Sequence, residues 1–215
     1  MRLFDILSVL YEPINKLDNH DHLLSYVQPQ LNPDGSCPIY KVEGERYDLR
    51  QYAQDPEQLK NLVDLLARLN RLVRWIHLQT DVLWFGIYLR HGDKLVKYVY
   101  NGEMSKAEFP ISEEYLQKSI NTRVIMEKQH YYIPDVDAHD GPYYRCDAKV
   151  KSELCCPIFA ANGEVIGIFD SEDHRKHFFD DKIDFIGQKV KKAIEIFLED
   201  HPYITQSDNF TAVID

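Results

Sequence analysis

Three of the four cysteines of the chain lie within residues 146–157, in the stretch CDAKVKSELCCP. A cluster of this kind can bind a metal, form a disulfide or supply a reactive thiol. Cys155 and Cys156 are neighbours in a predicted strand, so their side chains point to opposite faces and do not readily share one ion. A disulfide between them would strain the backbone. We therefore interpret the pair as small buried residues, and we expect no metal site.

Cys146 differs from this pair because it lies in a polar loop before the strand. Arg145, Lys149 and Lys151 are close to it in sequence. Neighbouring cations lower the pKa of a thiol, and a loop makes the sulfur accessible, which are the two conditions for reactivity. The residues favour Cys146 as a reactive thiol, and an ordinary exposed cysteine is the alternative.

Carboxylates accompany these thiols on two predicted strands. Asp170 and Glu172 share one strand face, and Glu153 lies on the strand before them. Because Asn162-Gly163 predicts a tight hairpin between the strands, the three carboxylates can converge. Such a pocket would bind an ammonium group, and crowded carboxylates raise one pKa enough to give a proton donor near neutral pH. A solvated strand end is the alternative.

The elements that must position these residues indicate an α+β fold. Asp55-Pro56 is typical of a helix start, and apolar residues then recur at three- and four-residue steps to about Leu78. We predict, in order, a helix at 56–78, a hairpin around residue 92, a helical stretch at 112–128, a short strand at 130–134, a long loop, strands at 152–160 and 164–172, and a helix at 180–200. This order implies an antiparallel sheet with helices packed against it.

Composition and length bound the organisation and the partners. We divide the chain into an N-terminal extension of helix plus loop (1–55), one domain (56–200) and a C-terminal tail (201–215). The formal net charge of −10 argues against nucleic acid or an anionic membrane as a partner. The start of the chain is no secretory signal, and no apolar run is long enough to span a bilayer. We therefore expect a cytoplasmic location with free thiols.

A set of segments in this order resembles the GAF domains and, among them, the free methionine-(R)-sulfoxide reductases. The segments are DVLWFGIYL, PDVDAH, CDAKVKSELCCPI, NGEVIGIFDSED and FFDDKIDFI, which span residues 81–200. The specific part is CDA-x3-SE-x3-P, whereas the aromatic strand and the final helix are general features of GAF domains. The resemblance implies a GAF-like antiparallel sheet flanked by helices.

The resemblance also implies a reaction and a set of site residues. In that family a cysteine thiolate attacks the sulfoxide sulfur while an acidic group protonates the oxygen, and the cysteine becomes a sulfenic acid. The family's carboxylates hold the substrate's amino group, which explains a preference for the free amino acid, and no cofactor is needed. The resemblance implies catalytic roles for Cys146, Glu153 and Glu172 and substrate-binding roles for Trp84, Tyr88 and Asp170.

The chain departs from the family where a resolving cysteine is expected. The family's GVCG motif is replaced by EEYLQKS at 113–119, and Glu172 replaces an aspartate. The stretch GPYYRC, which ends at Cys146, is bulkier than the family's usual GHIAC and one residue longer. We therefore expect regeneration by Cys155, by Cys37 in the extension, or by an external thiol such as thioredoxin.

A second hypothesis is a non-catalytic GAF module that binds an amino-acid-like ligand or senses oxidant through Cys146. The missing GVCG motif favours it, whereas the nucleophile and the three carboxylates together favour the enzyme. Our partner hypotheses are the small-molecule ligand, a thiol reductant and a second copy of the chain in a homodimer.

Overall fold

The computed structural model describes residues 1–14, 20–33, 37–38, 43–141, 143 and 147–201. Cys146 therefore lies outside the described residues, as does most of the predicted tail. In chain order the elements are α1 (Leu3–Tyr11), η1 (Asp21–Leu24), β1 (Ser25–Pro29), β2 (Gly44–Asp48), η2 (Leu49–Tyr52), α2 (Pro56–Thr80), β3 (Trp84–His91), β4 (Lys94–Asn101), β5 (Glu108–Pro110), α3 (Glu113–Leu116), α4 (Ile120–Glu127), β6 (Tyr131–Ile133), η3 (Val136–Ala138), β7 (Ser152–Phe159), β8 (Val165–Asp173), η4 (Ile183–Val190) and α5 (Lys191–Glu199).

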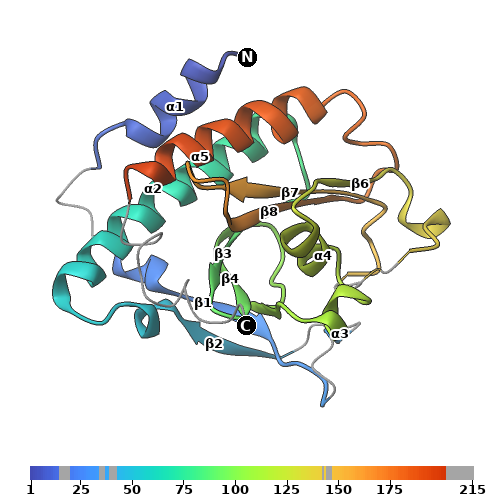
Figure 1. Cartoon of the computed structure of the whole chain (residues 1–215), viewed down its shortest axis with the longest axis horizontal. Coiled ribbons are helices and arrows are strands. Elements are labelled where there is room, and N and C mark those ends of the chain that lie inside the picture. Colours follow the sequence, from blue (N-terminus) through green and yellow to red (C-terminus); the bar gives the residue numbers. More distant parts are fainter. Residues whose placement is uncertain (15–19, 34–36, 39–42, 142, 144–146, 202–215) are drawn as a thin grey trace.

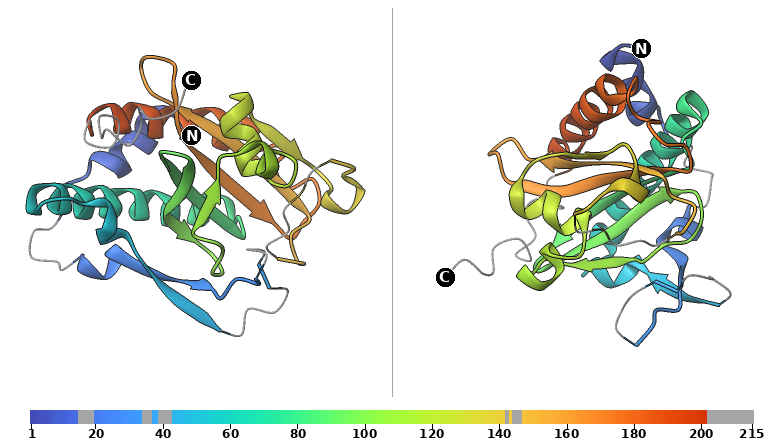
Figure 2. Two further views of the ribbon diagram at one scale, coloured as in Figure 1. Left: turned by 60° about the horizontal axis from the view of Figure 1, so that its bottom comes forward. Right: turned by 90° about the vertical axis from the view of Figure 1, so that its right-hand side faces the viewer.

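An antiparallel sheet in the order β5-β4-β3-β8-β7-β6 forms the centre of the molecule (Figure 1). Helix α2 packs against β3 and β4, α5 packs against β7, and α1 contacts both helices. Helix α4 contacts β7 and β8 from the other side, so the sheet lies between two layers (Figure 2). The predicted α+β architecture is confirmed.

Strand alternation divides the apolar residues into two clusters, one on each face of the sheet. On β7, Leu154 and Cys156 belong to the core beneath α2 and α5. Cys155 belongs to the cluster on the α4 side, and Glu153, two residues before it, shares that face. The predicted opposite orientation of the two thiols is confirmed, and the α4 side carries the chemistry.

Helix α2 begins where the sequence predicts. The Asp55 side chain caps it by accepting a hydrogen bond from Gln58 N at 2.8 Å, and Pro56 occupies the first turn. The helix ends at Thr80, slightly beyond the predicted end, and Asp81 follows in the left-handed region with φ 55°. No helix in the described part of the chain is both long and apolar enough to cross a bilayer.

The extension holds more structure than the predicted helix and loop. Helix α1 is present, but β1 and β2 also pair as a separate two-stranded sheet beside the β4–β5 end of the main sheet (Figure 2). Tyr47 is buried, and its hydroxyl donates a hydrogen bond to Glu108 of β5. The pairing escapes sequence analysis because the strands are short, far apart in sequence and not regularly alternating in burial.

Two predicted helices are interrupted. The stretch 112–128 forms α3 and α4 because the Ser119 side chain caps a new helix by accepting from Thr122 N. The final helix begins with a π-helical segment, η4, before α5. Apart from the helices, the sequence patterns also did not predict the short strand β5. The interruption at Ser119 matters most, because it turns the first residues of α4 toward the carboxyl groups.

Candidate functional site

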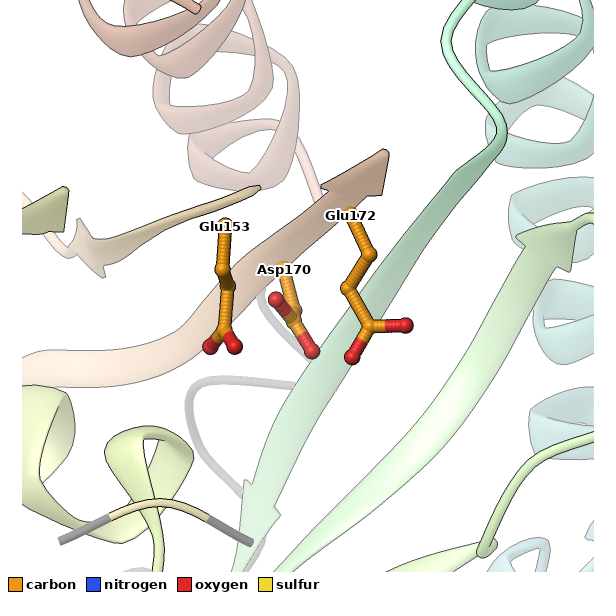
Figure 3. Close-up of side chains that lie close together, drawn as sticks. All are labelled: Glu153, Asp170 and Glu172. Atoms are coloured by element: carbon orange, nitrogen blue, oxygen red, sulfur yellow. The ribbon is translucent and has the colours of Figure 1, made fainter. Parts of the chain in front are cut away.

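Three carboxyl side chains converge on the α4 side of the sheet. Glu153 of β7 and Glu172 of β8 are paired directly across the strands, and Asp170 precedes Glu172 by two residues on the same face. One carboxyl oxygen from each lies within 4.8 Å of the others. Figure 3 shows the three side chains projecting to the same side. Glu153 and Asp170 are each only 4% exposed, so this is no solvated strand end.

The carboxyl groups line a small cavity together with two of the predicted aromatic residues, Trp84 and Tyr88. Sequence analysis missed six further lining residues, which come from the β4–β5 region, the start of α4 and the loop before β7. These are Ser105, Phe109, Ser119, Ile120, Asn121 and Tyr143. The serine cap of α4 is a local signal that could have placed Asn121 in a first helical turn, but nothing in the sequence says which strand that turn faces.

Trp84 lines one side of the cavity, and its indole ring lies over Gly86. Its indole Nε1 donates to the carbonyl oxygen of Glu103 at 3.0 Å, and its ring stacks on Tyr100 with centroids 6.2 Å apart. A Cβ at Gly86 would lie 2.3 Å from the Trp84 ring. Glycine therefore allows the indole to fold onto the sheet beside the carboxyl groups.

Asn121 connects a buried thiol to one of the carboxyl groups. Cys155 Sγ donates to Asn121 Oδ1 at 3.4 Å, and the Asn121 side chain also hydrogen-bonds Asp170. Since the amide oxygen faces the thiol, the amide nitrogen is the group that donates to Asp170. Asn121 is itself buried, so this contact fixes one side of the pocket.

Burial changes the protonation of the pocket. It raises the pKa of Glu153 well above its ordinary value, and the negative charges of Asp170 and Glu172 raise it further. Burial also raises the pKa of Asp170 to about 7, although the Asn121 hydrogen bond and the positive charge of Lys97 oppose the rise. The raised pKa favours the protonated form of Glu153, which can donate a proton, whereas Asp170 exchanges between its neutral and charged forms near neutral pH.

Tyr143 is the described residue of the preceding loop that reaches the carboxyl groups. Its hydroxyl hydrogen-bonds Glu153, and burial raises the pKa of Tyr143 well above 10. The phenol is therefore neutral and can donate its proton in a hydrogen bond to the carboxyl group. Cys146 follows three positions later, outside the described residues.

The other candidate thiols are buried. Cys155 is 0% exposed, and burial raises the pKa of its thiol well above 9. Burial likewise raises the pKa of Cys156 to about 12. Cys37 is buried in the same cluster as Cys155, on the pocket side of the sheet. Because the thiolate is the reactive form, a resolving role for Cys155 requires this packing to open.

The spacing of the three carboxyl oxygens would also allow them to hold a metal ion. A hard cation requires ionised carboxylates, and the raised pKa values of Glu153 and Asp170 oppose full ionisation. An ammonium group instead donates three directed hydrogen bonds and tolerates a partly protonated set. The pocket chemistry favours an ammonium ligand over a metal ion.

The antiparallel sheet, its helical layers and the pocket on the α4 side define the class of this protein. The chain belongs to the GAF domain family, whose model matches residues 64–196.

Within this class the chain is similar to the free methionine-R-sulfoxide reductase of Escherichia coli strain K12, with 30% identity over 91 residues. That match covers 42% of this chain and 51% of the relative, so the chain spans about half the length of that relative. The homology to these reductases, which the sequence motifs predicted, is confirmed.

Solved structures of such reductases share the fold. The free methionine-R-sulfoxide reductase from Neisseria meningitidis in complex with its substrate superposes with a TM-score of 0.55 at 22% identity, over 62% of this chain and 77% of that chain. The reduced form of fRMsr of Staphylococcus aureus gives a TM-score of 0.52 at 25% identity, over 62% of this chain and 83% of that chain.

Proposed function

We propose that this protein reduces free methionine-(R)-sulfoxide with Cys146 as the nucleophile. The observation that carries the proposal is the convergence of the buried Glu153 and Asp170 with the half-buried Glu172 in a cavity that Trp84 also lines. Homology to free methionine-R-sulfoxide reductases supports a reductase. The substrate and the nucleophile are our extension of that homology to this chain.

The pocket suits each part of a free amino acid. The substrate ammonium binds the ionised forms of Asp170 and Glu172, and the sulfoxide end packs on Trp84 and Tyr88. Glu172 is thus placed with the substrate-binding residues, in place of the catalytic role that the resemblance implies, because it is only half-buried. The first turn of α4 lines the cavity, and the positive end of its dipole suits the substrate carboxylate. A methionine sulfoxide within a peptide has an amide in place of the ammonium and would leave the buried carboxylates without a cation.

The reaction then proceeds by oxygen transfer between two sulfur atoms. The Cys146 thiolate attacks the sulfoxide sulfur while Glu153 gives its proton to the sulfoxide oxygen. The S–O bond of the substrate breaks, methionine leaves reduced by two electrons, and Cys146 becomes a sulfenic acid. The proton lost when the thiol ionised restores Glu153.

A second thiol completes the cycle. It attacks the oxidised sulfur of Cys146, water leaves, and the disulfide is reduced by an external dithiol such as thioredoxin. Cys37 and Cys155 are the candidates within the chain, and an external thiol can serve instead. Since both internal candidates are buried, we expect direct attack by an external thiol to contribute.

The second candidate function is a GAF module that binds an amino-acid-like ligand or senses oxidant through Cys146 without turnover. Two observations favour it: residues 113–119 contain no thiol, and Cys155 is buried with a raised pKa. Binding and turnover must therefore be measured separately.

Ligand recognition is tested by thermal unfolding with free methionine-(R)-sulfoxide and with its N-acetyl derivative. The free amino acid at 100 times its Kd should stabilise the protein by about 2.7 kcal/mol, which corresponds to a Tm increase of several degrees. The N-acetyl derivative should give no increase, because it has no ammonium.

Two matched variants make the test specific to the pocket. Glu172→Gln should remove most of the increase, whereas Glu164→Gln, exposed in the β7–β8 turn, should retain it. Equal stabilisation by the free and acetylated compounds would contradict the ammonium site, and stabilisation by magnesium or calcium alone would point to a metal site.

A further inference from the structure

Lys97 is a fully buried lysine on the sheet face that carries the carboxyl groups. It lies on β4 opposite Tyr88 of β3 and is 0% exposed. Its Nζ donates at 2.7 Å to both the carbonyl oxygen and the hydroxyl of Ser105, a residue that lines the cavity. A buried ammonium is costly unless its surroundings compensate it.

Aromatic rings provide that compensation. The Lys97 Nζ lies 4.2 Å from the ring centroid of Tyr100, 5.0 Å from that of Tyr26 and 5.9 Å from that of Trp84. Ring faces attract a cation, and an ammonium donates hydrogen bonds but accepts none. Acceptor oxygens and ring faces around Nζ therefore suit the charged form.

The N-terminal extension closes this ring cage, which we define as Tyr26, Trp84 and Tyr100 around Lys97. Tyr26 comes from β1, and its hydroxyl donates to the Lys97 carbonyl oxygen at 2.7 Å. Its ring packs edge-on against Tyr100 and stacks on Tyr47 of β2. The extension thus removes Lys97 from water, and in a less polar surrounding a charge acts more strongly on its neighbours.

The cage and the carboxyl pocket share a wall. Trp84 belongs to both, and Gly86 pairs with Tyr100 on one side and with Asp170 on the other. Lys97 lowers the pKa of Asp170 against the effect of burial. The other polar and titratable groups around Asp170 are Glu153 and Cys155 on β7, Glu172 on β8, Asn121 on α4 and Tyr143 in the loop.

We propose that Lys97, enclosed by the N-terminal extension, is a positioning residue that favours the charged form of Asp170 and so supports the negative charge with which the pocket binds a cation. The inference gives the extension a role in the site. It rests on the proposed function only for the identity of the ligand, since the buried position of Lys97 beside the cavity-lining Ser105 and Trp84 does not depend on any ligand.

The test is a carbon-13 NMR titration of the side-chain carboxyl groups in the ligand-free protein. In Lys97→Met the titration midpoint of Asp170 should rise by about half a unit to one unit relative to wild type. Lys106→Met is the matched control, because Lys106 is also buried but its Nζ donates to the Tyr115 hydroxyl. In this variant the titration midpoint of Asp170 should be the same as in wild type. A shift in both variants, or in neither, overturns the proposal.

A measurement on the unaltered protein avoids dependence on the folding of a variant. The nitrogen-15 chemical shift of Lys97 Nζ should be that of an ammonium at pH 7, and a neutral amine would overturn the proposal. Neither measurement uses the sulfoxide. Failure of the charge relation is therefore distinguishable from failure of the proposed reductase activity.

Discussion

Glu153→Gln is expected to lower kcat for free methionine-(R)-sulfoxide by about 100-fold or more while KM changes little. Burial and the neighbouring carboxylates raise the pKa of Glu153 well above its ordinary value and so favour the uncharged, protonated side chain. Glutamine preserves its size and charge but has no proton to transfer, and general acid catalysis contributes about 10² to 10⁴ in rate. The loss should therefore appear in the chemical step rather than in binding.

Steady-state turnover with excess dithiothreitol measures this effect. Glu172→Gln provides the contrast, because Glu172 is only half-buried and acts in our account as a charged ligand of the ammonium, so its loss should mainly raise KM. Glu164→Gln should match wild type. Unchanged kcat in Glu153→Gln, or a loss confined to KM, would exclude Glu153 as the proton donor.

Asp170→Asn is expected to make the protein more stable at pH 8 while it weakens ligand binding. Burial raises the pKa of Asp170 from 3.8 to about 7 in the folded protein. Below about pH 4 Asp170 is neutral in both the folded and the unfolded chain, and its full contribution to the free energy of unfolding is present. That contribution is lost as pH rises through about 7, because the unfolded chain ionises this carboxyl group freely and the folded chain does not. A shift of about three units corresponds to about 4 kcal/mol, and asparagine avoids this loss because it stays neutral.

Urea unfolding at pH 5 and at pH 8 measures the difference. Asp173→Asn is the matched control on the same strand. Burial alone would raise the pKa of Asp173, but hydrogen bonds from Arg175 and from Leu83 N outweigh it and hold the pKa below its usual value. That variant should therefore lose stability at pH 8. If Asp170→Asn were less stable than wild type at pH 8, this would contradict our claim that the buried Asp170 carboxyl group lowers stability for the sake of function.

Local sequence patterns were sufficient to predict the two strands that carry the carboxyl residues. The two-residue period puts Glu153 and Cys155 on one face, and the turn at Asn162-Gly163 brings β8 back alongside β7, with Gly163 at φ 84°. The start of α2 at Asp55 followed from capping chemistry. These features depend on neighbours in sequence, and the structure confirms them.

The rest of the pocket depends on packing between distant segments. Asn121 reaches Asp170 only because α4 docks on β7 and β8, which no local pattern of α4 indicates. Lys97 lies in the run KLVKYVY, where a lysine would be expected at the surface. Its burial follows from Tyr26 and the β1–β2 pair, whose strands are joined by a long connection.

The most direct test of the central claim is turnover of free methionine-(R)-sulfoxide by wild type and by Cys146→Ser, with dithiothreitol and with thioredoxin as reductants. Our account predicts turnover by wild type with at least one reductant and none above background by Cys146→Ser, while Cys37→Ser retains activity with dithiothreitol. No turnover by wild type with either reductant, or equal turnover by wild type and Cys146→Ser, would contradict the assignment as a reductase that uses this thiol.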